Sequence, residues 1–345
     1  MPTDLLHVPY DPAFQEGARN AVRVCLQVRP LERSVLITDR ASLPIGAALA
    51  AQFREAGADL STFVLEDLAP RPLRGLPAPV LDALEHAGVS CFAAVGQEGE
   101  LHSRIEMTAV VNRRRVRHAH MVNISPRIMV EGMRADFRKV DALCRWLLPR
   151  MEATQVFRAV SAAGTDLTAT FDPRIKWLKT SGIISPDKWG NLPGGEVLTA
   201  PDRVDGVFVV DGVLGDWMAA KYGDMQAHPL RIEIENSRIT RIDCDVREIV
   251  DDFRQYVSKD ENSNRVGELA LGTNVALRDP IGQILQDEKI PGLHIAFGHP
   301  YSEHTGATWR SSSHIDVVGR HFDVTLDDVP VMKDSKFLVD VDALA

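Results

Sequence analysis

The segment Gly-Leu-His-Ile-Ala-Phe-Gly-His-Pro-Tyr at residues 292–301 is followed by Ser-Ser-Ser-His-Ile-Asp at residues 311–316. Each segment contains a short apolar run in which alternate residues share one face of a strand. His294 shares its face with Ala296, and this small neighbour leaves the imidazole room to reach a ligand. His314 and Asp316 share a face, so they can converge on one cation or on two adjacent cations. The alternative interpretation is a structural hydrogen bond between His314 and Asp316.

Two further carboxylates occur in unusual contexts. Glu196 directly follows Gly194-Gly195, where a turn allows close approach of a ligand but is also an ordinary surface feature. Glu268 interrupts the otherwise apolar run of residues 266–272. An unpaired buried carboxylate is strongly destabilising, so a cation or hydrogen-bond donors should lie beside Glu268.

The composition is that of a globular protein large enough for two domains. The 345 residues are 45% hydrophobic and 25% charged, with a formal net charge of −9. This acidic balance argues against a general nucleic-acid or anionic-membrane binder, which needs a basic field. No run approaches the ~18 apolar residues of a membrane span.

The cysteines and the amino terminus indicate the compartment. The four cysteines are scattered without a Cys-x-x-Cys pair, which excludes a zinc ribbon or a thioredoxin-type motif and fits a reducing environment. Residues 1–10 have neither a basic nor an apolar signal region. We therefore expect a soluble cytoplasmic protein.

The first part of the chain alternates strands and helices. A helix is predicted over residues 12–30, then a strand at 34–39, a helix from Ser42 as N-cap to about residue 57, and a strand at 61–65. A helix at 77–87 and strands at 89–95 and 119–124 follow. This pattern predicts a doubly wound α/β domain with parallel strands. No strand leads into a glycine-rich nucleotide-binding motif.

After a helix predicted from about Met133 to Met151, the pattern changes to alternating strands. We place the domain boundary near residue 152, giving an α/β domain at 1–152 and a β-rich metal-binding domain at 153–345. Strands are expected at 207–210, 231–235 and 238–242, with a helix at about 246–256. Asn236-Ser237 is typical of a hairpin turn.

One basic cluster, residues 113–117, stands out, followed by His118 and His120. The first interpretation is a solvated face whose arginines pair with nearby acids. The other is a set of cations that holds a substrate carboxylate.

Taken in order, the four motifs resemble those of the thermophilic aminopeptidase family, the aminopeptidase T and aminopeptidase S type metallopeptidases. The matching motifs are Leu-Pro-Gly-Gly-Glu-Val-Leu-Thr, Gly-Glu-Leu-Ala-Leu-Gly, Leu-His-Ile-Ala-Phe-Gly-His-Pro-Tyr and Ser-His-Ile-Asp. The resemblance is specific over residues 190–330 and only topological before them. It implies a homodimeric enzyme that hydrolyses the amide bond of a small peptide or another small amide.

The resemblance also implies a site with two divalent ions, zinc, cobalt or manganese, and a water activated between them. Its ligands would be Glu196, Glu268, His294, His314 and Asp316. Glu268 would bridge the ions and act in catalysis. Tyr301 would be the active-site tyrosine that stabilises the oxyanion or completes a coordination sphere.

The chain departs from the family in one respect that concerns catalysis. Many members have a second acidic residue where this chain has Gly195. If that residue is the general base elsewhere, Glu303 or His304 is the candidate to replace it here.

Two alternatives remain open. The sequence also resembles 2,5-dihydroxypyridine 5,6-dioxygenase, whose single Fe(II) is held by a His-x-Asp pair and a further histidine. That enzyme has a histidine where this chain has Glu268 and lacks the carboxylate of Glu196, so both carboxylates favour hydrolysis. The other alternative is a non-catalytic metal-binding homologue.

Overall fold

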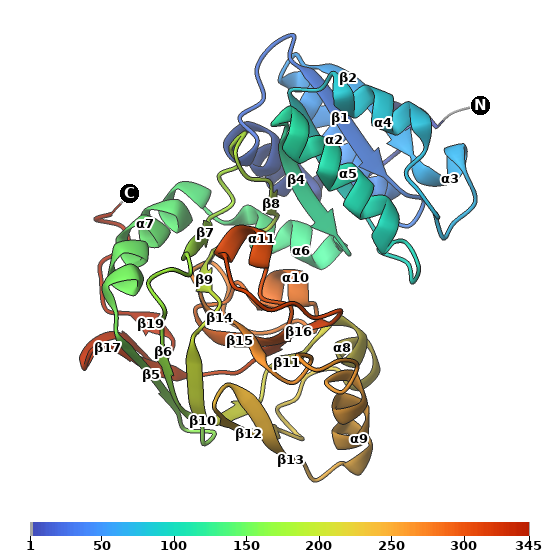
Figure 1. Cartoon of the computed structure of the whole chain (residues 1–345). Coiled ribbons are helices and arrows are strands. Elements are labelled where there is room, and N and C mark those ends of the chain that lie inside the picture. Colours follow the sequence, from blue (N-terminus) through green and yellow to red (C-terminus); the bar gives the residue numbers. More distant parts are fainter. Residues whose placement is uncertain (1–2, 345) are drawn as a thin grey trace. The chain divides into compact units, whose positions relative to one another are not determined.

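The computed structural model describes residues 3–344 (Figure 1). Contacts within the chain group these residues into two compact units. The first comprises the described residues of Met1–Arg138 together with Gly182–Gly194, and the second those of Lys139–Ser181 together with Gly195–Ala345. The boundary expected near residue 152 stays a prediction, and each unit is described by itself.

The first unit contains a five-stranded sheet within the described residues, and every strand pair in it is parallel. The strand order is β2 (Asp59–Val64), β1 (Arg33–Thr38), β3 (Val89–Ala94), β4 (Arg117–Val122) and β8 (Gly190–Asn191). The parallel β-α-β arrangement predicted for residues 34–65 is confirmed.

Helices cover both faces of this sheet (Figure 1). Ile37 of β1 belongs to the apolar cluster that contains Val110 of α5. Thr38 points to the other face, where a Cβ on Gly46 of α2 would lie 2.9 Å from its side chain. The doubly wound α/β class is therefore confirmed. The helical segments are η1 (Leu5–His7), η2 (Pro12–Phe14), α1 (Gln15–Arg19), η3 (Asn20–Cys25), α2 (Leu43–Glu55), α3 (Leu65–Leu68), α4 (Ala78–Glu85), α5 (Leu101–Arg114), α6 (Pro126–Val130) and η4 (Gly132–Arg134).

Two of the helices predicted in this unit differ in detail from the structure, and α5 was not predicted. The segment predicted as one helix over residues 12–30 is three short pieces that end at Cys25, the last a π-helical turn. Gln27 has a φ of 51°, a left-handed conformation that cannot continue a helix. Ser42 precedes α2 as expected, but its hydroxyl makes no capping hydrogen bond.

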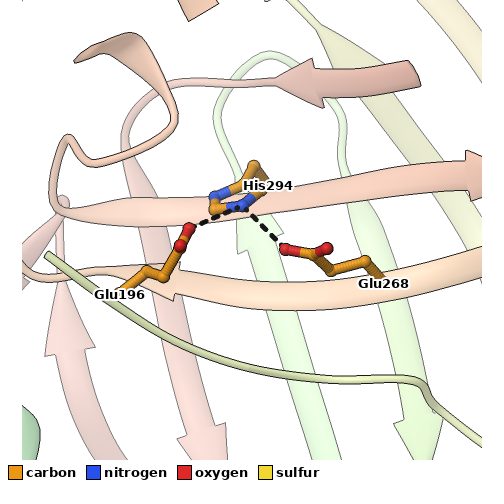
Figure 2. Close-up of side chains that lie close together, drawn as sticks. All are labelled: Glu196, Glu268 and His294. Carbon is orange, nitrogen blue, oxygen red and sulfur yellow. Dashed lines mark ion pairs between the residues drawn. The ribbon is translucent and has the colours of Figure 1, made fainter. Parts of the chain in front are cut away.

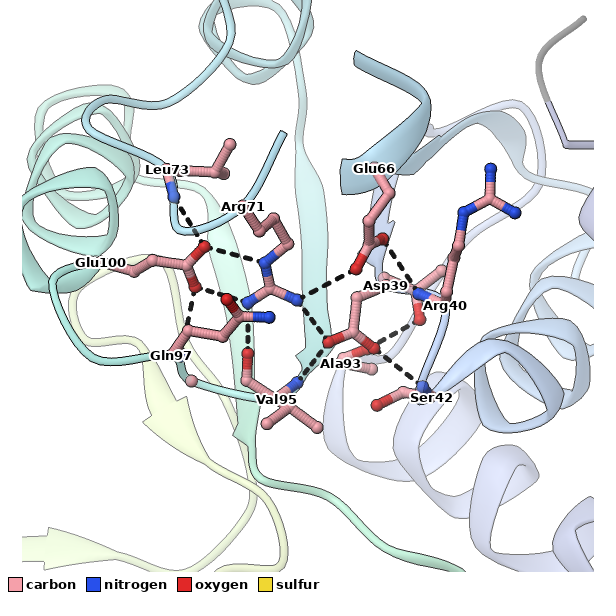
Figure 3. A network of polar contacts seen from close by, with 12 residues as sticks. Asp39, Arg40, Ser42, Glu66, Arg71, Leu73, Ala93, Val95, Gln97 and Glu100 are labelled. Carbon is pink, nitrogen blue, oxygen red and sulfur yellow. Dashed lines mark hydrogen bonds and ion pairs between the residues drawn. The ribbon is translucent and has the colours of Figure 1, made fainter. Parts of the chain in front are cut away.

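Charged side chains fill the carboxyl ends of β1 and β3 (Figure 3). The side chain of Arg71 is almost fully buried and pairs with Asp39, which follows β1, at 2.6 Å, and with Glu100 at 2.5 Å. Its guanidinium also donates to the carbonyl of Val95, which follows β3. Ligands of doubly wound folds usually bind at such strand ends. Here ion-paired side chains of the protein occupy that position.

The basic cluster pairs with acids in the same unit. This agrees with the first interpretation made from the sequence, in which the arginines serve salt bridges. The pairs are Arg113 and Arg114 with Glu85, Arg115 with Asp187, and Arg117 with Glu32.

The second unit begins in α7 (Phe137–Ala153), which starts four residues later than predicted. Met133 lies instead in η4, and Asp136 accepts a hydrogen bond from the backbone N–H of Arg138 at the start of α7. Within the described residues this unit has two antiparallel sheets. The first contains, in order, β13 (Arg238–Asp243), β12 (Leu230–Glu235), β10 (Arg203–Val210), β6 (Asp166–Thr170), β5 (Val156–Ser161), β17 (Phe322–Leu326), β18 (Val329–Lys333) and β19 (Lys336–Phe337). Asn236 and Ser237, with φ values of 50° and 63°, form the predicted hairpin turn between β12 and β13 of this first sheet.

The other antiparallel sheet carries the candidate site. The site-bearing sheet contains, in order, β11 (Val213–Leu214), β16 (His314–Val318), β15 (Gly292–Gly298), β14 (Val266–Gly272), β9 (Glu196–Thr199) and β7 (Leu178–Thr180). The remaining helices of the unit are α8 (Asp216–Tyr222), α9 (Arg247–Tyr256), α10 (Ile284–Asp287) and α11 (Ser302–Thr305).

Candidate metal centre

Strand register places the predicted donors on one face of the β9–β14–β15–β16 sheet. Ala296 pairs with Glu268 on one side and with Asp316 on the other. Directly opposed residues share a face, and so do residues two apart along a strand. His294 and His314 therefore project to the same side as the two carboxylates. The period-2 assignment made from the sequence agrees with this register.

Small residues make room for these long side chains. Glu196 is opposed by Gly272, and His294 is opposed by Ala270. Ala296 lies between Glu268 and Asp316. The residues of the sheet beneath the site are therefore alanine and glycine. The donors can therefore lean toward one another above the sheet.

The first donor group contains Glu196, Glu268 and His294 (Figure 2). The His294 Nε2 atom lies 3.5 Å from a carboxylate oxygen of Glu196 and 3.5 Å from one of Glu268. Both distances exceed a normal hydrogen bond, and Nε2 has no hydrogen-bond partner among the described residues. All three residues are at most 4% exposed.

This arrangement fits a metal ion. Tetrahedral zinc with bonds of ~2.1 Å holds its ligands about 3.4 Å apart, close to the separations found here. A buried imidazole nitrogen without a partner is costly, and coordination would satisfy it. The mixed nitrogen and oxygen donors suit zinc, cobalt or manganese better than calcium.

The second donor group contains Glu268, His314 and Asp316. The His314 Nε2 atom lies 3.3 Å from Asp316 Oδ1 and 3.8 Å from the second carboxylate oxygen of Glu268. His314 Nδ1 lies 2.9 Å from the carbonyl of His299. A carbonyl only accepts, so Nδ1 donates to it, and Nε2, which is hydrogen-bonded to Asp316, is the nitrogen that would coordinate an ion in place of its proton.

Opposite charges control protonation in both groups. Burial opposes the charged form of Glu196, but Lys289 and His294 outweigh it and lower the pKa of this carboxyl. Burial likewise opposes the imidazolium of His314, yet Asp316 and Glu268 raise its pKa to about 10. The carboxylates that stabilise a positive charge on His314 would also stabilise a metal ion that replaces the proton on Nε2.

Two charged residues at this site were missed in the sequence. Lys289 Nζ lies 2.6 Å from Glu196 Oε1 and 2.5 Å from Glu288 Oε1. Glu288 also forms a third potential donor group with His294 and Asp316. Burial raises the pKa of Glu288 to about 8, although Lys289 opposes this shift. The only sequence signal was a charged triplet before the β15 strand, and such a triplet is usually solvated.

Tyr301 lies beside the second donor group. Its ring centroid is 4.8 Å from that of His314, and the residue is 37% exposed. Burial of the hydroxyl and the surrounding carboxylates, Glu268 first among them, raise its pKa well above 10. The phenol therefore stays protonated and can donate a hydrogen bond. Glu303 and His304, the predicted candidates for a general base, follow in α11, where Glu303 is exposed.

Close packing explains the glycine before Glu196. A Cβ on Gly195 would lie 2.8 Å from that of Asn274, and the φ of 138° also favours glycine. Backbone hydrogen bonds from Gly195 to Thr180 and from Thr273 to Gly195 hold this approach. No side chain can therefore be placed at residue 195 without moving the neighbouring segment.

A parallel α/β unit and an antiparallel unit with a buried imidazole–carboxylate cluster together characterise a candidate metal-dependent enzyme. The comparison with protein families assigns it further. The chain belongs to the thermophilic metalloprotease (M29) family, whose model matches residues 134–324. The family resemblance inferred from the four motifs is thus confirmed.

Two solved structures share the fold over nearly the whole chain. 2,5-Dihydroxypyridine dioxygenase from Pseudomonas putida KT2440 has a TM-score of 0.70 and 16% identity, covering 98% of this chain and 99% of the other. Wild-type AmpT from Thermus thermophilus has a TM-score of 0.70 and 18% identity, covering 95% and 99%. No curated protein matches the sequence significantly. None of the helices in residues 3–344 has the length and apolarity needed to cross a bilayer.

Proposed function

We propose that this protein is an aminopeptidase-like hydrolase of amide bonds that depends on two divalent metal ions. One observation carries the proposal. The two carboxylate oxygens of Glu268 face different imidazoles, one 3.5 Å from His294 Nε2 and the other 3.8 Å from His314 Nε2. A carboxylate placed between two histidines is the arrangement that a bridging ligand needs.

The proposed ligands divide between two positions. Glu196 and His294 would hold one ion, His314 and Asp316 the other, and Glu268 both. Bound together, such ions lower the pKa of a water toward neutrality and polarise a carbonyl oxygen. The membership of the M29 family supports this chemistry.

The protein's own residues supply orientation and hydrogen bonds. Tyr301 stays protonated at neutral pH and lies beside His314, so its hydroxyl can donate to the oxyanion of an attacked carbonyl. The carbonyl of His299 fixes the tautomer and ring orientation of His314. Tyr301 is therefore the proposed catalytic tyrosine, and His299 a positioning residue.

Several expectations accompany this proposal. The substrate would be a small peptide with a free amino terminus or another small amide. The protein would act as a homodimer in the cytoplasm, and its β-rich domain, residues 153–345, would carry the reaction. The donors do not distinguish zinc from cobalt or manganese, whose availability often decides occupancy.

Ring cleavage by a single Fe(II) is the second candidate because the dioxygenase from Pseudomonas putida shares the fold. An iron site of that class needs two histidines and one carboxylate with open positions. His294, His314 and Asp316 could supply that set. The buried carboxylates of Glu196 and Glu268 beside them favour the hydrolytic proposal.

Substrate assays with defined metals separate these functions. We expect the protein loaded with zinc, cobalt or manganese to hydrolyse amino-acid anilides or aromatic amides, and chelation to stop the reaction. Glu268→Gln, which keeps the size of the side chain, should abolish turnover and lower metal affinity by about 100-fold or more. The matched control, Glu248→Gln, changes an exposed glutamate. Iron-dependent oxygen uptake with 2,5-dihydroxypyridine, without amide hydrolysis, would refute the proposal.

A further inference from the structure

A lysine ammonium lies inside the candidate metal centre. Lys289 is 1% exposed, and its Nζ contacts Glu196 and Glu288 at 2.6 and 2.5 Å. A buried ammonium is stable only when an anion compensates it, and here the carboxylate of Glu196 does so while Glu288 lies within hydrogen-bond distance on its other side. The proposed ions would therefore share their carboxylates with a cation that belongs to the protein.

The backbone holds Lys289 at this place. Its N–H donates to the carbonyl of Gln286, and its own carbonyl accepts from the N–H of Asn274, both at 2.9 Å. The segment also lies directly on β14, since a Cβ on Gly272 would be 1.9 Å from the carbonyl oxygen of Ile290. These contacts fix the backbone of Lys289 beside the site, within reach of Glu196.

Lys289 affects the two donor groups differently. Glu196 Oε1 accepts hydrogen bonds from both Lys289 and Thr180, each at 2.6 Å, which leaves Oε2 toward His294. In the first donor group, the carboxylate of Glu196 is therefore already paired with the positive charge of Lys289. Within residues 3–344 Lys289 forms no ion pair with Glu268 or Asp316, the carboxylates of the second group, and its charge acts on Asp316 without a direct contact.

We propose that Lys289 makes the two metal positions unequal. The second group, with His314 and Asp316, binds its ion tightly, whereas the first group, with Glu196 and His294, binds weakly and exchanges. Like charges repel across a buried site, so the ammonium opposes an ion on the same carboxylate. This inference rests on the proposed function and adds its regulation. The enzyme would hold one ion when metal is scarce and gain the second as the metal concentration rises.

Titration calorimetry of the metal-free protein with zinc tests the inequality. We expect two binding steps that differ in affinity by at least about 10-fold. In Lys289→Met the weaker step should tighten by about 10- to 100-fold, the range that residues next to metal ligands commonly control. The matched control, Lys179→Met, removes an ammonium of the same unit that pairs with Asp141 instead, and should leave both steps unchanged.

A pair of histidine variants assigns the steps without changing Lys289. His294→Ala should remove the weaker step, and His314→Ala the tighter one. Wild-type protein dialysed without free zinc should retain about one ion per chain, and about two in excess zinc. These measurements decide the question even if Lys289→Met does not fold.

The outcomes separate this inference from the proposed function. Two equally tight steps in wild type, an unchanged weaker step in Lys289→Met, or the reverse assignment by the histidine variants would overturn the role of Lys289, while a two-metal hydrolase would remain. Failure of the wild type to bind any ion would remove both proposals.

Discussion

At the scale of single residues, Tyr301 is a direct test of the proposed chemistry. Because its pKa is raised well above 10, the phenol is a hydrogen-bond donor over the whole neutral range. We expect Tyr301→Phe to lower kcat by roughly 100- to 1000-fold, the usual effect of losing one oxyanion donor. Metal content should not change, because the ring contacts His314 but supplies none of the proposed ligand atoms.

Steady-state kinetics and elemental analysis of Tyr301→Phe would be compared with Tyr222→Phe. The Tyr222 hydroxyl donates to Asp252 on another part of the same unit. Loss of metal from Tyr301→Phe, or an unchanged kcat, would contradict the assigned role.

The sequence predicted those donors that are polar residues within otherwise apolar strands. Glu268 within an apolar strand and His294 beside Ala296 stand out because a strand normally buries aliphatic side chains there. Glu288 and Lys289 could not be found in this way. Their burial depends on the close packing of the segment before β15 against Gly272, which has no side chain. A contact between residues so far apart in the chain produces no local pattern in the sequence.

At the scale of secondary structure, β14 needs glycine at residue 272. We expect Gly272→Ala to destabilise the protein by about 1–3 kcal/mol or more, because the added carbon would overlap the carbonyl of Ile290. It should also displace Lys289 and so change the weaker metal-binding step. In the control, Gly190→Ala, the new Cβ would meet only Ile184, at 3.9 Å.

Urea unfolding at neutral pH measures this difference. Equal unfolding free energies for the two alanine variants would show that the segment of Lys289 is not held against β14.

A second element-scale prediction concerns the buried histidines of β4. Burial lowers the pKa of His118 to about 3, and that of His120 also falls, so both are neutral in the folded protein. The unfolded chain binds protons near pH 6.5. The folded state therefore loses stability as the pH falls from about 6.5 toward 3, by roughly 1–3 kcal/mol at pH 4.5 for His118.

Unfolding free energies of His118→Gln and of wild type at pH 7 and 4.5 would test this. The variant should lose less stability on acidification, whereas His228→Gln, at an exposed position, should behave as wild type. An unchanged acid dependence in His118→Gln would contradict a neutral buried His118.

Strands were predicted more reliably than helices because buried strands are continuous apolar runs, as in β1 and β3. The α5 helix was missed because it buries only Ser103, Met107, Val110 and Val111 among fourteen residues. Its remaining face is polar, so the apolar period of a helix is hardly visible in the sequence. The start of α7 and the end of the first helical segment were displaced by local turns that propensity does not reveal, whereas α9 was predicted within one residue.

At the scale of the whole molecule, metal binding should stabilise the folded state. The site brings together four acidic side chains, two histidines and one lysine, and an ion that binds only the folded arrangement stabilises the folded state. For each metal position, we expect free zinc at 100 times the dissociation constant of that position to stabilise the folded protein by about 2.7 kcal/mol and to raise its melting temperature.

Thermal unfolding with zinc and after chelation measures this effect. Glu268→Gln, which alters both donor groups, should show little metal-dependent shift. A wild-type melting temperature that does not respond to metal would argue against any ion in this site.

The central claim is that five side chains from four strands hold metal ions. Anomalous diffraction from crystals grown with excess zinc tests it most directly. We predict one peak among Glu196, Glu268 and His294 and another among Glu268, His314 and Asp316. Peaks elsewhere, with none within bonding distance of His294 or His314, would contradict the account.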